Sequence, residues 1–286
     1  MKISSLFGKG KTVFSFEVFP PKNTTPIESI YHTLSELKAF SPDFISVTYG
    51  ARGTSADTTT CDIASYIQNQ LGITSAAHLT CVYSDKSLIL ERLAQLKERG
   101  VENILALRGD INSEIPRLHD FEYASDLTRF IKENGDFHVS GACYPECHLE
   151  ADNLDKDIEN LKVKIEAGAD HLMSQLFFDN SVFFNFLEKA RAAGVNVPIE
   201  AGIMPVTNAK QIQRMVSMCG ASLPAKFSKT MQRYESNPEA LRDAGIAYAV
   251  DQIVDLISSG VDGIHLYTMN NPYVAGKISE SIKNML

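Results

Sequence analysis

Short apolar runs alternate with longer amphipathic segments along the whole chain. The runs are rich in Val, Ile, Leu and Phe and have the length of buried strands, while each segment between them is long enough for one helix. This alternation is typical of βαβ units that build a parallel sheet. The apolar runs predict strands at residues 13–19, 44–49, 76–82, 103–108, 138–143, 171–177, 198–203 and 263–267.

The segments between the strands predict the helices and the fold class. Residues 219–237 fit no βα unit and are interpreted as an elaborated loop after the seventh strand. Eight βα units without a linker predict a single α/β domain over residues 1–286, a (β/α)8 TIM barrel rather than an open doubly wound sheet. The expected helices cover residues 26–39, 57–70, 85–99, 124–134, 152–167, 180–193, 208–218, 238–259 and 272–286.

Polar side chains stand where the predicted strands end. In a (β/α)8 barrel the active site lies at the carboxyl ends of the strands, so these side chains are candidate site residues. The polar ones are Glu17, Thr48, Tyr49, His78, Arg108, Asp110, Tyr144, Glu146, His148, Gln175 and Asn270, and Gly109 and Met204 stand beside them at strand ends.

The sharpest change from apolar to polar comes at Arg108-Gly109-Asp110, directly after the apolar run Leu105–Leu107. Asp110 is interpreted as a site residue at the tip of the fourth strand, and a structural ion pair is the alternative. Gly109 would let the backbone approach a ligand closely.

Glu17 lies in an aromatic stretch between Phe16 and Phe19, and Pro20-Pro21 ends the strand. Desolvation favours the uncharged form of a carboxylic acid, which suits a general acid near neutral pH. The alternative is a carboxylate that only pairs with a neighbouring cation. His78 likewise is either a ligand contact or a core histidine bonded to the backbone.

Metal and phosphate motifs are weak in this sequence. Cys143 and the Cys147-His148 pair have no second pair at zinc-like spacing, so we expect no metal site. Gly10-Lys11-Thr12 lacks the first glycine of a P-loop, and no Gly-x-Gly-x-x-Gly follows a strand. A bound phosphate would instead meet helix N-termini or cations such as Lys164 and Arg108.

Composition and charge exclude some classes of binding partner. The chain has 286 residues, 44% hydrophobic and 22% charged, with a net charge of -8 and no separate block of Lys or Arg. An acidic surface without a basic patch argues against nucleic acid and anionic membrane partners. Five cysteines at irregular spacings predict no disulfide framework, and no apolar run reaches the roughly 20 residues of a membrane span. We therefore expect a cytoplasmic protein.

Eight segments, taken in order, resemble the methylenetetrahydrofolate reductase family over nearly the whole chain. Each segment alone is a weak signal, but all eight occur in the family's order and spacing. They are FEVFPP at 16–21, VTYGA at 47–51, HLTC at 78–81, LRGD at 107–110, YASD at 123–126, YPE at 144–146, QLFFD at 175–179 and IMPV at 203–206. The chain resembles the short bacterial form.

The resemblance implies a flavin-dependent oxidoreductase of one-carbon metabolism and methionine supply that carries FAD across its strand tips. It implies a ping-pong order: NADH or NADPH reduces the flavin and leaves, and 5,10-methylenetetrahydrofolate then takes the hydride at the same face and becomes 5-methyltetrahydrofolate. Glu17 matches the general acid that protonates the folate as its ring opens. Asp110 matches the carboxylate that lies close to flavin and pterin.

The same resemblance assigns contact residues. Gln175 and Gln211 match positions that contact the folate. Val163, Met215 and Asn271 depart from the family pattern, since an Arg, a Phe and an Arg are common at these positions. The positions that match FAD contacts are Thr48, Tyr49, Ala51, His78, Arg108, Gly109, Asp110, Ala124, Tyr144, His148, Asp157, Asn160 and Lys164.

Alternatives stay open beside the reductase. One is a flavin-free barrel that transfers or cleaves a one-carbon unit on a pterin. Another is a reductase subunit that takes electrons from a partner protein rather than from NADH. The sequence leaves the choice between NADH and NADPH undecided, and it allows a homo-oligomer without identifying a contact surface.

Overall fold

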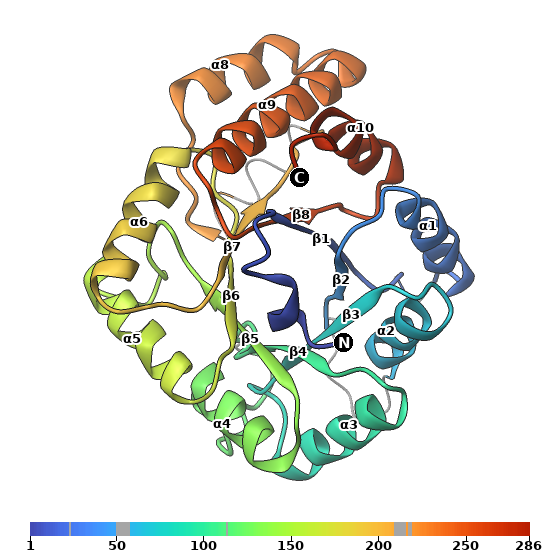
Figure 1. The fold of residues 1–286 in the computed structure, drawn as a ribbon, viewed down its shortest axis with the longest axis vertical. Helices are drawn as coiled ribbons and strands as arrows, with labels where there is room; N and C mark the ends of the chain where they lie inside the picture. The colour runs from blue at the N-terminus through green and yellow to red at the C-terminus, as the bar shows by residue number, and fades with distance from the viewer. Residues whose placement is uncertain (23, 50–57, 113, 209–215, 217–218) are drawn as a thin grey trace.

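The computed structural model describes residues 1–22, 24–49, 58–112, 114–208, 216 and 219–286. Within this part of the chain, parallel strands close into a barrel in the order β1 to β8, which confirms the predicted (β/α)8 fold (Figure 1). The strands are β1 Val13–Val18, β2 Phe44–Val47, β3 Thr74–Thr80, β4 Asn103–Leu107, β5 His138–Cys143, β6 His171–Ser174, β7 Ile199–Ile203 and β8 Gly263–Tyr267.

Helices surround the barrel and face it with their apolar sides (Figure 1). The helix predicted at 208–218 falls almost wholly outside the described residues. The helices are α1 Glu28–Lys38, α2 Thr59–Asn69, α3 Lys86–Glu98, α4 Ala124–Asn134, α5 Leu154–Glu166, α6 Asn180–Ala192, α8 Ala225–Tyr234, α9 Pro238–Ser258 and α10 Pro272–Ile282, with the 3-10 helix η1 at Ile3–Leu6.

One segment differs from its prediction. Residues 219–237 were expected to form only a loop, yet they contain α8, which packs against α9. Phe227 and Met231, one helical turn apart, are both buried in a cluster with Phe178 and Leu241. These two apolar positions are too few to show a helical period in the sequence, so the helix forms through its packing against neighbouring elements.

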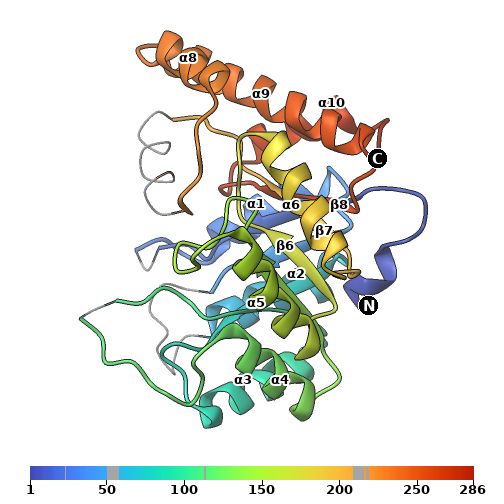
Figure 2. The ribbon, with the colours of Figure 1, turned by 90° about the vertical axis from the view of Figure 1, so that its left-hand side faces the viewer.

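Alternate residues of each strand face opposite sides of the barrel wall. In β1, Phe14 and Phe16 belong to the large cluster between barrel and helices, whereas Val13 belongs to an inner cluster with Ile3 and Leu6 of η1. The 3-10 helix therefore closes the amino-terminal end of the barrel. Figure 2 shows η1 at one end and the long connection between β4 and α4 projecting from the opposite end.

The barrel interior also contains polar side chains that the sequence analysis did not place there. Ser15, His138, His171, Glu200 and His265 are all buried. Each occupies an inward position on its strand, where an apolar side chain is the usual filling of such a barrel. No helix among the described residues is long and apolar enough to cross a membrane.

Candidate functional site

Two adjoining cavities lie at the carboxyl ends of the strands. The strand-tip cavity has a volume of about 570 Å³ and the side cavity one of about 450 Å³. Arg108, Tyr144 and His148 line both cavities, so the two adjoin along these residues. Of the predicted residues, the strand-tip cavity also contains Glu17, Thr48, Tyr49, His78, Gly109, Asp110 and Gln175, and the side cavity Ala124, Asp157, Asn160, Val163 and Lys164.

Three positions from the sequence analysis, Ala51, Gln211 and Met215, lie outside the described residues. Apart from Asn271, every other predicted catalytic, FAD or folate position lines one of the two cavities. The fold thus brings together side chains that are spread over more than half of the sequence.

Glu17 is enclosed by histidines rather than by cations. Its Oε2 atom lies 3.6 Å from His78 Nε2 and 3.7 Å from His265 Nε2, and its side chain is 20% exposed. Burial lowers the pKa of His78 to about 4, although the charge of Glu17 acts in the opposite direction. The His78 ring is therefore uncharged at neutral pH. Among the described residues, no Lys or Arg forms an ion pair with Glu17.

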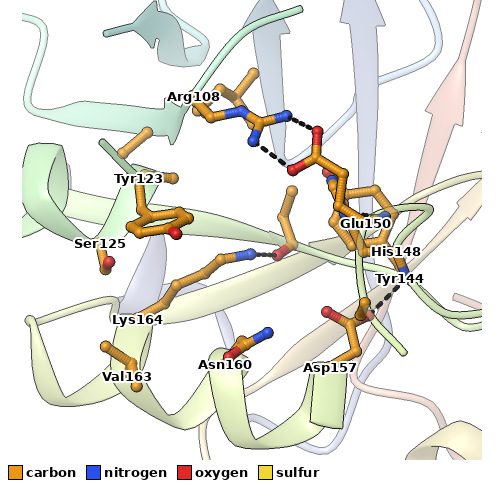
Figure 3. Close-up of a pocket in the computed structure, with 15 residues that line it drawn as sticks. Arg108, Tyr123, Ser125, Tyr144, His148, Glu150, Asp157, Asn160, Val163 and Lys164 are labelled. Carbon is orange, nitrogen blue, oxygen red and sulfur yellow. Dashed lines mark hydrogen bonds and ion pairs between the residues drawn. The ribbon is translucent and has the colours of Figure 1, made fainter. Parts of the chain in front are cut away.

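Arg108 pairs with Glu150, a residue that sequence reasoning missed. Its two terminal nitrogens donate to the Glu150 carboxylate at 2.6 and 2.7 Å, as Figure 3 shows. This fork raises the pKa of Arg108 and lowers that of Glu150, the shared hydrogen bond being the largest cause of both shifts. The predicted alternative of an ion pair at the strand tip holds for Arg108, but its partner comes from the loop before α5.

Gly109 and Asp110 follow at the rim of the strand-tip cavity. Gly109 has φ +89°, and a Cβ atom there would lie 3.1 Å from both Thr80 Cβ and Val82 Cγ1. The glycine therefore lets this backbone pack against the end of β3. Asp110 is exposed at the cavity rim, where its carboxylate can face a bound ligand.

The side cavity presents a cation and a phenol (Figure 3). Lys164 on α5 donates to the Ala142 carbonyl at 2.8 Å, and its Nζ lies 5.6 Å from the centre of the Tyr144 ring. Burial lowers the pKa of Lys164, against the opposing charge of Asp157. Burial also raises the pKa of Tyr144 to about 12, so its hydroxyl stays protonated. Asp157 accepts a hydrogen bond from the His148 backbone N–H at 2.9 Å.

Two asparagines after β8 form hydrogen bonds with backbone groups of neighbouring segments. Asn270 accepts from the Phe19 N–H at 3.0 Å and donates to the Phe19 carbonyl at 2.8 Å, tying the loops after β1 and β8 together. Asn271 is the N-cap of α10 and accepts from the Val274 N–H at 3.2 Å. Neither side chain is among those that line the two cavities.

Tyr267 and His265 of β8 line the strand-tip cavity but were absent from the sequence analysis. Tyr267 is the last residue of its strand and donates to the Ser174 carbonyl at 2.8 Å. The rule that strand-end polar residues build the site would have found it. Gln175, which was predicted, has its Oε1 bound to the Leu176 N–H at 2.9 Å.

Cys143 and Cys147 show no metal-site geometry. Cys143 is buried, and burial raises its pKa to about 12. No group of three or more His, Cys, Asp or Glu side chains suited to a metal ion occurs in the described residues.

A closed (β/α)8 barrel with two adjoining cavities at its strand tips, lined in part by charged and polar side chains, is typical of the barrel enzymes whose ligands bind at this face. The family model for methylenetetrahydrofolate reductase matches residues 2–283. The chain belongs to the methylenetetrahydrofolate reductase family.

Individual relatives agree with this family. The chain is 35% identical to 5,10-methylenetetrahydrofolate reductase of Pectobacterium carotovorum, over 96% of this chain and 91% of the relative. It is 33% identical to the enzyme of that name from Escherichia coli, over 96% and 92%. It is 36% identical to methylenetetrahydrofolate reductase (NADH) 1 of Arabidopsis thaliana over 94% of this chain, but it spans only 48% of that longer protein.

A solved structure shares the fold at low sequence identity. It is an uncharacterized protein from Clostridium thermocellum, described as binding two copies of 5-methyl-5,6,7,8-tetrahydrofolic acid. The TM-score is 0.70 at 14% identity, over 96% of both chains. This likeness supports the barrel fold alone.

Proposed function

We propose that the protein reduces 5,10-methylenetetrahydrofolate to 5-methyltetrahydrofolate with NADH or NADPH and FAD. The family membership supports the reaction, and one observation within the structure carries the mechanism. Glu17 lies in the strand-tip cavity beside a His78 ring that is neutral at ordinary pH. A carboxylic acid in that position can deliver one proton to a bound substrate.

The residues around the cavities fit FAD on chemical grounds. Arg108 and Lys164 are cations on the side cavity, and the buried Lys164 ammonium has a lowered pKa that an anionic diphosphate would reverse. The neutral Tyr144 hydroxyl offers a further hydrogen bond where the two cavities join. When bound, FAD would supply two-electron redox chemistry between the nicotinamide and the folate, which we propose to follow a ping-pong order.

The chain's own residues handle the proton and the charge. Glu17 donates its proton to N10 of the folate as the bond between the bridging carbon and N10 breaks. This opening leaves a cationic folate, and Asp110 at the cavity rim provides a negative charge that stabilises it. Gln175, at the same cavity, is proposed to orient the pterin.

An absorbance experiment tests the proposal. Purified protein is incubated with FAD, reduced anaerobically with NADH, and then mixed with 5,10-methylenetetrahydrofolate. Bleaching of the bound flavin band, followed by its return on mixing, is the expected result. Protein that binds no flavin would refute the reductase function and favour the flavin-free alternative. Bound flavin that neither NADH nor NADPH bleaches would point to a partner protein as electron donor.

Glu17→Gln separates the two half-reactions. Removing the acid is expected to slow reoxidation by the folate by about 100-fold or more, the usual contribution of a general acid, while NADH still bleaches the flavin. The matched control is Glu188→Gln on α6, an exposed carboxylate outside both cavities. Equal reoxidation rates in the Glu17 variant and the control would contradict the role of Glu17.

A further inference from the structure

A buried chain of polar groups runs through the barrel below Glu17. The Ser15 hydroxyl lies 2.9 Å from Glu200 Oε1 and 2.6 Å from His265 Nδ1. On the other side of the carboxyl group, His171 Nε2 lies 3.1 Å from Glu200 Oε2. All four residues are buried.

The sheet register explains why these groups meet. Ser15 of β1 is paired directly with His265 of β8, and Glu200 of β7 is paired with Gly263 of β8. A Cβ atom on Gly263 would lie 2.7 Å from Glu200 Cγ. The glycine therefore makes room inside the barrel for a carboxylate that a larger residue would exclude.

The single hydroxyl proton of Ser15 links the protonation of Glu200 to that of His265. A hydroxyl has one proton, so it can donate to only one of Glu200 and His265 at a time. If Ser15 donates to Glu200, then His265 carries the proton on Nδ1. If Ser15 donates to His265 Nδ1, then Glu200 carries the proton and the His265 Nε2–H points outward. The Ile264 carbonyl is a third and more distant acceptor for Ser15, at 3.4 Å, so the protonation of Glu200 biases the tautomer of His265.

His265 transmits that state to the active site. Its Nε2 atom lies 3.7 Å from Glu17 Oε2, so a shift of less than 1 Å brings the two into hydrogen-bond distance. Ser46 provides a second contact at 3.4 Å from the same nitrogen. One end of the chain therefore reaches the residue that loses a proton in each proposed turnover.

The other end of the chain leads toward the closed face of the barrel. His171 Nδ1 lies 2.9 Å from His138 Nε2, and His138 Nδ1 lies 3.5 Å from Asp170 Oδ2. His138 Nδ1 is buried without a hydrogen-bond partner, whereas Asp170 is 33% exposed and pairs with Lys132. Solvent protons can reach Asp170 even when substrate fills the strand-tip cavity.

We infer that Glu200, Ser15 and His265 form an internal proton path that returns a proton to Glu17 after each turnover. When Glu17 has given its proton to the folate nitrogen, His265 Nε2 passes one to the Glu17 carboxylate. Ser15 donates its proton to His265 Nδ1 and receives the one from Glu200. Glu200 is then reprotonated from solvent by way of Asp170, His138 and His171, once His138 Nδ1 and Asp170 Oδ2 close from 3.5 Å to hydrogen-bond distance. No oxidant or reductant is needed, and one proton enters for each one consumed.

The surroundings of Glu200 support its place as the proton store of this path. The groups facing it come from β1, β6 and β8, namely Ser15, His171, Gly263 and His265 by way of Ser15. No Lys or Arg of the described chain forms an ion pair with it. The inference rests on the proposed function, because it assigns Glu17 as the general acid.

The test compares the first turnover with later ones in a rapid-mixing experiment with excess NADH and methylenetetrahydrofolate. Glu200→Gln removes the proton store, and Ser15→Ala removes the connecting hydroxyl. Because the path acts only after Glu17 has given up a proton, the first turnover should stay within about twofold of the unmodified protein. Later turnovers should slow about tenfold or more, with a larger solvent deuterium isotope effect.

Ser75→Ala is the matched control, since this buried hydroxyl forms no hydrogen bond with any described group of the path. Later turnovers at the unmodified rate in either path variant would overturn the path, and so would an equal loss in Ser75→Ala. Should Glu200→Gln fail to fold, Ser15→Ala applies the same criterion. Absence of folate-dependent reoxidation in the unmodified protein would instead refute the proposed function, which distinguishes the two failures.

Discussion

Acid should destabilise this protein more steeply than its carboxylates alone would, because two buried histidines are uncharged in the fold. Burial lowers the pKa of His78 to about 4 and that of His138 to about 2. A histidine in an unfolded chain has a pKa of about 6.5. Below that pH the unfolded chain binds protons that the folded protein does not, so stability is lost as the pH falls from 6.5 toward the folded values.

The magnitude follows from proton linkage. Between about pH 7.5 and pH 5.5 both folded pKa values lie well below the range, so only the unfolded state takes up the protons. Each histidine then lowers the free energy of unfolding by about 1.4 kcal/mol, and the two together by about 3 kcal/mol. This is a large part of the roughly 5–15 kcal/mol that a folded protein usually has.

Urea denaturation at the two pH values measures this loss. The chain contains no Trp, so far-ultraviolet circular dichroism is the suitable signal. His78→Gln and His138→Gln should each remove about half of the pH-dependent loss, whatever they do to stability at the higher pH. The control is His32→Gln on α1, a ring that is 80% exposed. If both buried variants keep the full pH dependence of the unmodified protein, the two histidines are not its source.

Three further changes test other contacts. Glu150→Ala releases the Arg108 guanidinium from its ion pair, so a phosphate of FAD can take the place of the Glu150 carboxylate. FAD should then bind up to about fivefold more tightly, because a half-exposed ion pair is worth about 0.2–1 kcal/mol. Weaker FAD binding in a titration would contradict this assignment. Asn271→Arg should tighten folate binding, as the family pattern implies, and unchanged folate affinity would refute the mapping of this position. The same substitution removes the N-cap of α10, so the free energy of unfolding measured in urea should fall by about 1 kcal/mol. Gly245→Ala should lower the melting temperature although Ala has the better helix propensity, because a Cβ atom there would clash with the Val206 carbonyl oxygen. A higher melting temperature would show that α9 can move away from the loop after β7 without loss of stability.

The pattern of apolar and polar residues predicted the bounds of several strands and helices correctly. The β5 and β8 bounds agree with their predictions, and α4 begins and ends at the predicted residues. Strand length and alternation with helices were sufficient there, because a parallel strand buried on both sides reads as an apolar run. The α8 helix was missed because its apolar side has only two buried residues, Phe227 and Met231.

The sequence predicted which side chains gather at the strand tips, but not which of them form ion pairs or hydrogen bonds with one another. Strand-end position alone placed Glu17, His78, Arg108 and Asp110 at one face, because all parallel strands of a barrel end there. The partner of Arg108 was not predictable, since Glu150 is 42 residues away and lies on a loop. Pairing between a strand tip and a distant loop depends on the path of the chain in three dimensions.

The sequence by itself therefore determined the barrel, the face that carries the site, and through its eight motifs the family. Those features depend on periodicity, strand count and local residue order, which are written directly along the chain. Only the tertiary structure decided what fills the barrel. Ser15, Glu200 and His265 are separated by 65 to 250 positions, and each stands alone among apolar neighbours. Strand register brings them within hydrogen-bond distance, because closing a barrel fixes which residue of each strand lies opposite the next.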